Sequence, residues 1–293
     1  MEAFHLLPEH LGSGGYDSPM KLGAAVMLVA FAAIAVKDDY GNTVRLKKPA
    51  ARIVTLAPHL TELVYAAGGG ARMVGAVEHS DYPPAARELP RVGSDAHINL
   101  ESVLALKPDL IVAWPNAGSV RTVDRLASLG LAVFRSEPRE LEDIATTLER
   151  LGTLTGSERV ARRAASSFRE RKAALEKRYA NLPKVRVFYQ IWDRPLITVN
   201  GAHVISKVIA LCGGENVFGG LGPIAPEVSA ETVLSAKPQV LLTSNPAAKP
   251  PPWLTGVRSV VVPADLIQRH TPRLLDGAEL VCKGLEEARR DKS

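Results

Sequence analysis

The chain has 293 residues, of which 46% are hydrophobic and 23% charged, which is enough for one large or two ordinary domains with apolar cores. Its 36 basic and 31 acidic residues give a net charge of +5 and are interspersed, as in the stretch 169–172. Because long runs of like charge are missing, the sequence argues against a nucleic-acid-binding tail, and we expect no nucleic-acid partner.

The first part of the chain has the pattern of a leader. A basic start at Met20-Lys21 precedes the apolar stretch 22–35, which ends in the small-x-small triplet 33–35. We therefore expect a secretory signal peptide over about 20–35, with translation beginning at Met20 and cleavage after Ala35. The stretch is shorter than the roughly 20 apolar residues that span a bilayer, so a membrane anchor is the less favoured alternative. The sequence thus predicts export from the cytoplasm.

Short strands and helices alternate between residues 36 and 155. Apolar runs that stop at proline are typical of buried parallel strands, and glycine clusters end helices. In chain order we expect a turn and short strand within 38–46, a strand at 52–58, a helix at 61–67, a strand at 74–77, a loop at 79–84, a helix beginning after Asn99, a strand at 110–114, a helix at 120–129, a strand at 132–135 and a helix at 140–152.

One long helix is expected in the middle of the chain. Residues 157–181 contain no glycine or proline, and Val160, Ala164 and Phe168 recur on one face. A helix of about 25 residues would be roughly 37 Å long, enough to run along one lobe and reach the next. The alternation then resumes, with strands expected at 185–191, 240–243 and 259–263, and helices at 203–211 and 272–290.

A sequence unit occurs twice, half a chain apart. Residues 99–114 recur as 229–244, with Glu101 matching Glu231. Two copies indicate two similar lobes, and a crevice between lobes is a common place to bind a small ligand.

Alternating strands and helices on both sides of one long helix predict an α/β fold, with two similar lobes and mostly parallel sheets. We expect a leader and signal peptide at 1–35, an N-terminal α/β lobe at 36–155, a connecting helix at 156–182 and a C-terminal α/β lobe at 183–293. A single stiff connector would permit only limited hinge motion.

Cys212 and Cys282 are the only cysteines. In an exported protein an isolated pair is plausibly a disulfide, which would close a loop of about 70 residues and stabilise the fold by roughly 4 kcal/mol in the chain-entropy view. Two buried free thiols are the alternative. A zinc site is not expected, because no pair of histidines accompanies the cysteines.

Several segments carry a resemblance to a known family. They are residues 52–62, 79–84, 99–101, 106–114 and 212–216, together with Asp265 and Arg269. From about Lys37 to about Arg290 the chain resembles the periplasmic binding proteins that serve ABC importers for iron-siderophores, haem and vitamin B12, and within them the vitamin B12 branch. The resemblance implies the class III fold of this superfamily and a disulfide between Cys212 and Cys282.

The resemblance also implies a role for the repeated glutamates. In the family, one surface glutamate on each lobe meets arginines of the membrane permease, and these positions match Glu101 and Glu231. The alternative is that each is only a first-turn acid favoured by the helix dipole, worth about 0.3–1 kcal/mol. We expect docking to an inner-membrane ABC permease, with its ATPase as a further partner, by a monomeric binding protein.

The ligand implied by the resemblance is a corrinoid, cobalamin or cobinamide, and no resident cofactor is expected. Asp265 and Arg269 match positions that bind corrin amide side chains in the family, although a surface ion pair would explain them too. Pro58 and His59 follow the first buried strand, where open α/β sheets bind ligands. The expected ligand-binding residues are Pro58, His59, His79, Asp95, Trp114, Trp192, Asp265 and Arg269.

The pocket departs from the family pattern at positions where vitamin B12-binding relatives have aromatic side chains. His79 stands at one such position, and the others lie near Asp95 and Ala225. No direct metal site is expected, but His79 could be an axial ligand to the cobalt of a bound corrinoid. The alternative is an exposed loop histidine. Trp114 and Trp192 would supply apolar surface, unless they only pack at strand ends.

Haem, a ferric siderophore and an enzymatic activity are the alternatives to a corrinoid ligand. Haem-binding relatives usually have a tyrosine ligand where this chain has Ser94, although His79 or His97 could replace it. A ferric siderophore is a further alternative, but no cluster of arginines or aromatic residues supports it. A secreted enzyme is the remote alternative, since the chain contains no Gly-x-Ser-x-Gly, P-loop or His-Glu-x-x-His motif.

Overall fold

The computed structural model describes residues 33–116, 118–246 and 251–291. Most of the predicted signal peptide, 20–35, lies outside the described residues. The first strand, β1 (Ile34–Lys37), pairs antiparallel with β2 (Thr43–Leu46). The expected cleavage after Ala35 therefore falls inside a strand.

The N-terminal lobe is built on a parallel four-stranded sheet with the order β4-β3-β5-β6. Neighbouring residues of β3 and β5 face opposite sides of this sheet, and both sides are covered. Ile53 and Leu110 pack with α1 and α4, whereas Val54 and Ile111 pack with α2 and α3. Burial of both faces explains why these strands are continuous apolar runs. The elements are β3 (Ile53–Thr55), α1 (Pro58–Ala66), β4 (Met73–Ala76), α2 (Leu100–Ala105), β5 (Leu110–Ala113), α3 (Val120–Ser128), β6 (Val133–Arg135) and α4 (Leu141–Thr155), with 3-10 turns at Gly70–Arg72 and Pro84–Glu88.

The C-terminal lobe repeats this arrangement on a parallel sheet with the order β10-β7-β11-β12. Val187 and Leu242 face α6 and α9, while Phe188 and Leu241 face α7. The elements are β7 (Val185–Gln190), the hairpin of β8 (Trp192–Asp193) and β9 (Leu196–Ile197), α6 (Val204–Leu211), β10 (Gly214–Asn216), α7 (Ala230–Ser235), β11 (Val240–Thr243), β12 (Arg258–Val261), α8 (Ala264–Ile267) and α9 (Leu274–Arg290).

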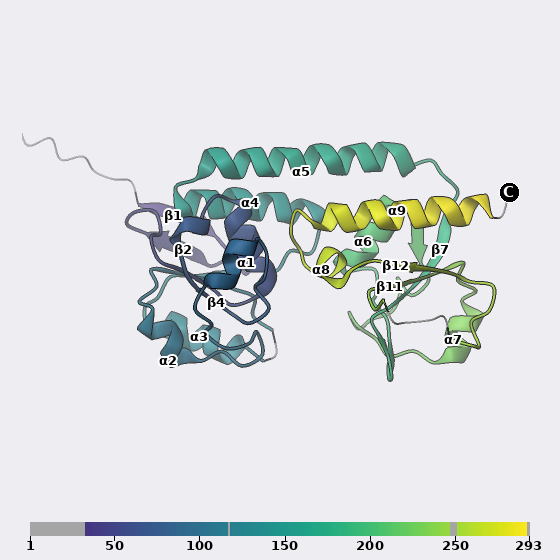
Figure 1. The fold of residues 1–293 in the computed structure, drawn as a ribbon, viewed down its shortest axis with the longest axis horizontal. Coiled ribbons are helices and arrows are strands. Elements are labelled where there is room, and N and C mark those ends of the chain that lie inside the picture. Colours follow the sequence, from purple (N-terminus) through teal and green to yellow (C-terminus); the bar gives the residue numbers. More distant parts are fainter. Residues whose placement is uncertain (1–32, 117, 247–250, 292–293) are drawn as a thin grey trace, which may run out of the picture. The chain divides into compact units, whose positions relative to one another are not determined.

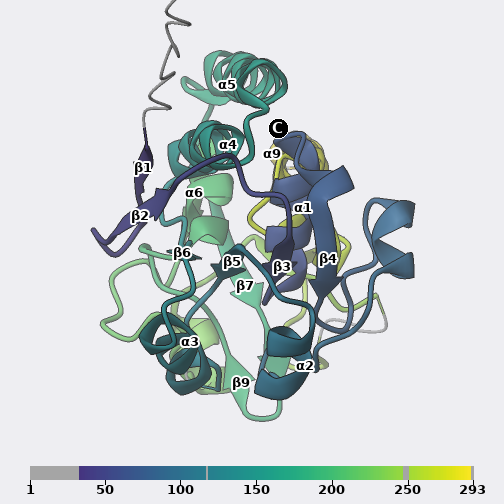
Figure 2. The same ribbon diagram turned by 90° about the vertical axis from the view of Figure 1, so that its left-hand side faces the viewer.

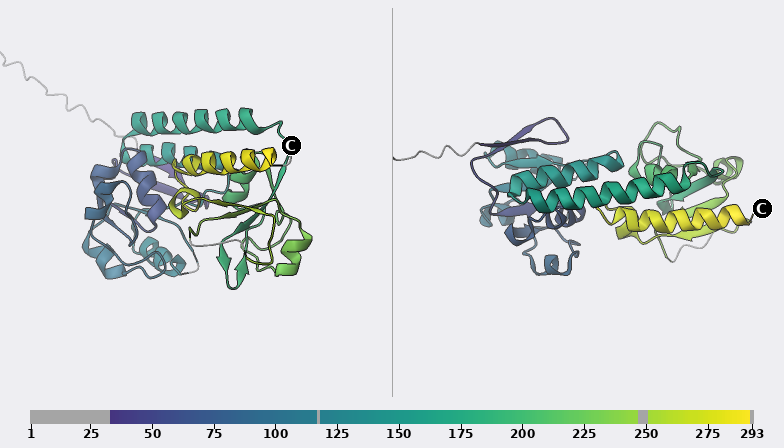
Figure 3. Two further views of the ribbon diagram at one scale, coloured as in Figure 1. Left: turned by 45° about the vertical axis from the view of Figure 1, so that its right-hand side comes forward. Right: turned by 90° about the horizontal axis from the view of Figure 1, so that it is seen from above.

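The connecting helix, α5 (Glu158–Tyr179), lies beside α4 and continues alongside α9, so it contacts elements of both lobes (Figures 1 and 3). The end-on view of Figure 2 also shows α5 stacked against α4. Gly156 permits the reversal between the two helices because its φ of 66° lies in the left-handed region. At 22 residues the helix is slightly shorter than the 25 expected.

The two copies of the repeated unit have the same local structure. Asn99 and Ser229 cap α2 and α7 by accepting hydrogen bonds from Ser102 N and Thr232 N. Two residues after the end of each helix stands a lysine with positive φ, 46° at Lys107 and 44° at Lys237. In each copy, an arginine from the neighbouring strand closes the helix end: Arg52 Nη2 donates to Leu106 O (2.6 Å) and Arg186 Nη2 to Ala236 O (2.5 Å). The repeat predicted from sequence is thus a repeated helix–strand unit.

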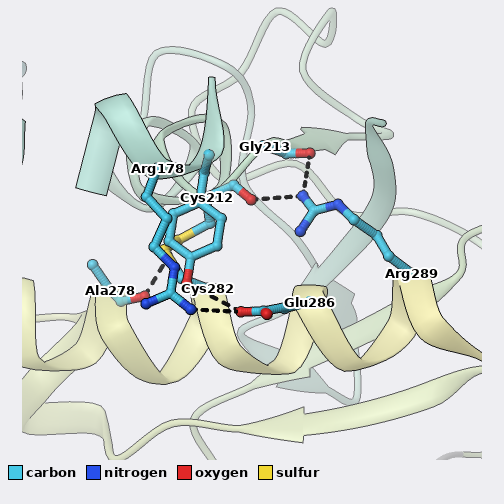
Figure 4. Close-up of a disulfide and its surroundings, with 8 residues drawn as sticks. Arg178, Cys212, Gly213, Ala278, Cys282, Glu286 and Arg289 are labelled. Carbon is cyan, nitrogen blue, oxygen red and sulfur yellow. Dashed lines mark hydrogen bonds and ion pairs between the residues drawn. A yellow bond between two sulfur atoms is a disulfide. The ribbon is translucent and has the colours of Figure 1, made fainter. Parts of the chain in front are cut away.

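Cys212 and Cys282 form a disulfide that joins the end of α6 to the middle of α9 (Figure 4). The predicted pairing is confirmed, and both residues are completely buried. Close by, Arg289 Nη2 donates to the carbonyl oxygens of Cys212 (2.8 Å) and Gly213 (3.0 Å), which satisfies the last carbonyls of α6. Gly213 has a φ of 70°, and a β-carbon there would lie 2.9 Å from the backbone oxygen of Tyr179, so the position favours glycine.

The predicted strands and long helices are confirmed with small shifts at their ends. Helix α4 continues three residues beyond the predicted Gly152, because Gly156 rather than Gly152 ends it. Gly152 instead lets α5 approach, since a β-carbon there would lie 2.3 Å from Ala161 Cβ. The hairpin β8–β9, the strand β10 and the short helix α8 were not predicted.

Candidate functional site

The carboxyl ends of the N-terminal lobe's central strands bring together two of the predicted residues. His59 begins α1 directly after β3, and its ring centroid lies 5.5 Å from that of Trp114, which follows β5. Open parallel sheets bind ligands at this edge. His59 also lies 6.0 Å from the ring of His270, which belongs to the C-terminal lobe and in turn lies 6.2 Å from His203. The strand ends of one lobe therefore meet histidines of the other.

These histidines are held in the neutral form. Burial lowers the pKa of His59 to about 3, with help from the nearby His270 and Arg269. Burial likewise lowers the pKa of His270 to about 4, and His203 adds to the effect. The Nε2 atom of His59 is buried and has no hydrogen-bond partner among the described residues. The cluster is thus an uncharged, mostly aromatic contact between the lobes at neutral pH.

An ionic cluster, Glu62–Asp81–Arg269–Arg273–Asp265, joins the lobes beside the histidines. Arg269 Nη1 lies 2.7 Å from Glu62 Oε1 and 2.7 Å from Asp81 Oδ1. Arg273 lies 3.4 Å from Glu62 Oε1 and 2.8 Å from Asp265 Oδ2. We call these five residues the interlobe clasp. Glu62 is only 3% exposed, and burial raises the pKa of its carboxyl above the usual value although both arginines act to lower it.

In the clasp, Asp265 and Arg269 have other partners than the sequence suggested. The sequence suggested a simple pair between these two residues, or direct ligand contacts. In the structure each has a partner elsewhere, because Asp265 accepts from Arg273 and Arg269 binds carboxylates of the N-terminal lobe. A ligand that binds these two side chains has to displace them from their present partners in the clasp.

His79 lies next to the clasp on an exposed loop. Its carbonyl oxygen accepts a hydrogen bond from Arg269 Nη2 (3.2 Å), and its φ is 61°, in the left-handed region. Histidine is one of the few non-glycine residues enriched in this conformation. Ser80, the next residue, is fully buried and accepts from Thr61 Oγ1 at 3.0 Å, which anchors the loop. The imidazole of His79 is therefore presented from a fixed backbone.

A polar pocket lies at the carboxyl ends of β7 and β11 in the C-terminal lobe. It has a volume of about 290 Å³ and is lined by residues 190–193, 243–245 and Gln268. Trp192 belongs to this pocket and is 59% exposed. Its indole nitrogen donates to Arg194 O (2.9 Å), which fixes the plane of the ring. The tryptophan can offer an apolar face to a bound molecule.

The predicted ligand residues thus fall into three groups. Pro58, His59 and Trp114 lie at the strand ends of the N-terminal lobe, His79, Asp265 and Arg269 surround the clasp, and Trp192 lines the polar pocket. Asp95 belongs to none of them. It is a partly exposed loop residue, and its carbonyl oxygen accepts from Asn116 Nδ2 at 3.4 Å.

Residues that sequence reasoning missed include Glu62, Asp81, Gln190, His270 and Arg273. A glutamate among apolar neighbours in Leu60–Val64 was the one available signal, since a buried acid needs a partner.

Glu101 and Glu231 occupy matching places on α2 and α7, the helices that cover the same sheet face in each lobe. Both side chains are exposed. Figure 1 shows α2 and α7 on the side of the lobes away from α5. A hydrogen bond with Ser229 lowers the pKa of Glu231. The two helices therefore present one carboxylate each.

Two negative findings apply to the part of the chain that the structure describes. No group of three or more histidine, cysteine, aspartate or glutamate side chains is arranged to hold a metal ion. No helix within the described ranges combines the length and apolarity that a membrane span requires.

Comparisons with known proteins agree with this fold. Residues 53–270 match the family described as periplasmic binding protein. The chain is 42% identical over 252 residues to a vitamin B12-binding protein of Vibrio cholerae, covering 83% of this chain and 91% of that protein. Among solved structures, the periplasmic vitamin B12-binding protein BtuF of Vibrio cholerae aligns with a TM-score of 0.77 and 40% identity, covering 82% of this chain and 98% of that one. A periplasmic haem-binding protein of Roseiflexus, at 23% identity and a TM-score of 0.69, covers 82% of this chain and 99% of its own and shares the fold.

Proposed function

Because the chain belongs to the periplasmic binding protein family, we propose that it is the substrate-binding component of an ABC importer and that its substrate is a corrinoid. The observation that carries the proposal is the 42% identity to a vitamin B12-binding protein over 83% of the chain. The haem-binding relatives share only the fold at 20–24% identity, which favours a corrinoid over haem. Cobalamin and its precursor cobinamide are the proposed ligands.

The proposed binding surface follows the carboxyl ends of the strands in both lobes. Trp114 and Trp192 would contact the apolar faces of the ring, while Pro58 and His59 form the floor on the N-terminal side. Asp95 is proposed as a contact at the rim. Large apolar contact with a few polar groups suits a flat ring that carries polar groups only at its edge.

Three groups around the clasp are proposed to bind the polar parts of the ligand. Asp265 and Arg269 would bind amide groups at the ring edge after exchanging partners within the clasp. His79 is the proposed axial ligand to cobalt, because neutral imidazole is a good ligand for transition metals. Its exposure and anchored backbone support this role, since an axial ligand must reach the metal without losing its position.

The proposed partner is an inner-membrane permease with its ATPase. Glu101 and Glu231 would meet basic residues of the permease, one from each lobe. Exposed charges of this kind set encounter and orientation more than affinity. We propose that the protein is exported to the periplasm and works there as a monomer without a resident cofactor.

Recovery of the ligand after binding separates this function from enzymatic activity. The chain from Val36 onward would be incubated with cyanocobalamin, freed of excess by gel filtration and denatured, and the released ligand identified by mass spectrometry. A binding protein releases one unchanged molecule per chain. A chemically altered corrinoid would point to an enzyme instead, and no retained corrinoid would contradict the proposal.

A further inference from the structure

The polar pocket of the C-terminal lobe contains a buried amide that the protein itself does not satisfy. Gln190 is the last residue of β7, pairs in register with Thr243 of β11, and is 5% exposed. Its Oε1 atom is buried and has no hydrogen-bond partner among the described residues. Most buried polar atoms in native proteins have a hydrogen-bond partner, so the unpaired Oε1 of Gln190 beside a pocket requires an explanation.

One amide of the lining is already engaged within the protein. Gln268 lines the same pocket, and its Nε2 donates to Ser244 Oγ at 2.7 Å and to Tyr189 OH at 3.3 Å. These two bonds use both N–H donors of Gln268, so it donates none to Gln190. Among the described residues that line the pocket, none is basic and Asp193 is the only charged one. The pocket is therefore built for neutral polar groups rather than for anions.

We propose that Gln190 is a specificity-determining residue that binds a primary carboxamide of the ligand. A carboxamide offers N–H donors and a carbonyl acceptor side by side, which complements the amide of Gln190 in either orientation. A carboxylate offers no donor and would lie near Asp193. A site built to hydrogen-bond a group discriminates strongly against an analogue that lacks it.

This inference rests on the proposed function, because corrinoids carry primary carboxamides around the edge of the ring. The position suits such a contact. Gln190 lies at the carboxyl end of a parallel strand, two residues before Trp192, whose exposed ring can hold the apolar part of the same ligand. One short segment would then provide both the stacking surface and the amide contact.

The test measures discrimination between amide and acid. The purified chain would be titrated with cyanocobalamin and with each of its monocarboxylate derivatives, in which one edge carboxamide is hydrolysed. We expect one derivative to bind about tenfold more weakly than cyanocobalamin, which corresponds to the loss of one good hydrogen bond. In Gln190→Met, which keeps the length but not the polar atoms, that difference should disappear and the affinity for cyanocobalamin should fall by about tenfold.

Two further variants make the result specific. Gln190→Glu keeps the shape and places a carboxylate against the ligand, so it should increase the preference for the amide. Because both substitutions conserve volume, failure of one to fold leaves the other to decide. Gln268→Met is the matched control, since the amide nitrogen of Gln268 already donates to Ser244 and Tyr189, and the discrimination should survive in it.

Two results would overturn the inference in different ways. Wild-type protein that binds corrinoids while Gln190→Met keeps full affinity and full discrimination would contradict the role of Gln190 alone. Wild-type protein that binds no corrinoid would overturn the proposed function, and this inference with it.

Discussion

Arg269 Nη1 lies 2.7 Å from Glu62 Oε1, and this contact joins two residues that are 207 positions apart and belong to different lobes. Arg273, which directly precedes α9, reaches the same carboxylate. A carboxylate that is almost completely buried between two arginines opposes separation of the lobes. Together with α5, which lies against both lobes, the clasp provides a physical reason for limited hinge motion.

Removing the shared carboxylate should destabilise the protein. Glu62→Gln leaves Arg269 and Arg273 without their common partner, and breaking a buried pair in this way typically costs about 3–5 kcal/mol. Since the arginines are partly exposed, we expect about 2–4 kcal/mol in the free energy of unfolding, measured by urea denaturation. Glu137→Gln is the control, because its pair with Arg139 is exposed and should contribute less than about 1 kcal/mol. Equal effects of the two substitutions would show that the clasp does not hold the lobes.

The histidines packed between the lobes predict a loss of stability in mild acid. His59 and His270 have pKa values of about 3 and about 4 in the folded protein, against about 6.5 in the unfolded chain. Between pH 6.5 and pH 4 the unfolded chain therefore binds more protons, so the free energy of unfolding falls as the pH falls. From pH 7 to pH 5 each ring should contribute a loss of roughly 2 kcal/mol.

Denaturation of His59→Phe across the same pH range isolates one of these rings. The variant should lose less stability than the wild type on acidification, by roughly 2 kcal/mol, because phenylalanine cannot take up the proton. His97→Gln serves as control, since His97 is exposed on a loop, and its pH profile should match that of the wild type. A wild-type profile in His59→Phe would mean that His59 is not held neutral by burial.

The repeated glutamates should act in delivery and not in capture. Glu101→Ala combined with Glu231→Ala removes one exposed carboxylate from each lobe and should abolish uptake of corrinoid in cells while corrinoid affinity stays unchanged. Each single substitution should give an intermediate effect, because the other lobe still docks. Glu158→Ala, a first-turn acid on α5 and away from the repeat, is the matched control. Undiminished uptake by the double variant would refute the docking role.

Local features of the sequence were sufficient to predict most of the fold. The run Ile53–Thr55 is apolar and stops near Pro58, and such runs form buried strands because both sheet faces are covered. The repeat 99–114 and 229–244 was predictive because the same cap, helix and strand had to form twice. The lone pair Cys212 and Cys282 permitted only one intramolecular disulfide.

The residues of the candidate site were harder to predict from the sequence, because they come together only where the two lobes meet. Glu62 stands out locally as an acid among apolar residues, but its segment does not name a partner, and only the placement of α1 against the C-terminal lobe pairs it with Arg269. Gln190 ends an apolar run and was included in the strand prediction, since nothing local reveals that its amide lacks a partner. Hairpin β8–β9 has two-residue strands, which are too short to show a periodicity.

Parallel titrations of the purified chain from Val36 onward with cyanocobalamin, cobinamide and haem would show which of these ligands the protein binds. Quenching of tryptophan fluorescence reports contact with Trp114 and Trp192, and the visible spectrum of the ligand reports a change at the metal. We expect one corrinoid bound per chain at micromolar affinity or tighter, no response to haem, and a spectral change with cobinamide that is lost in His79→Ala. Binding of haem without binding of either corrinoid would contradict this expectation.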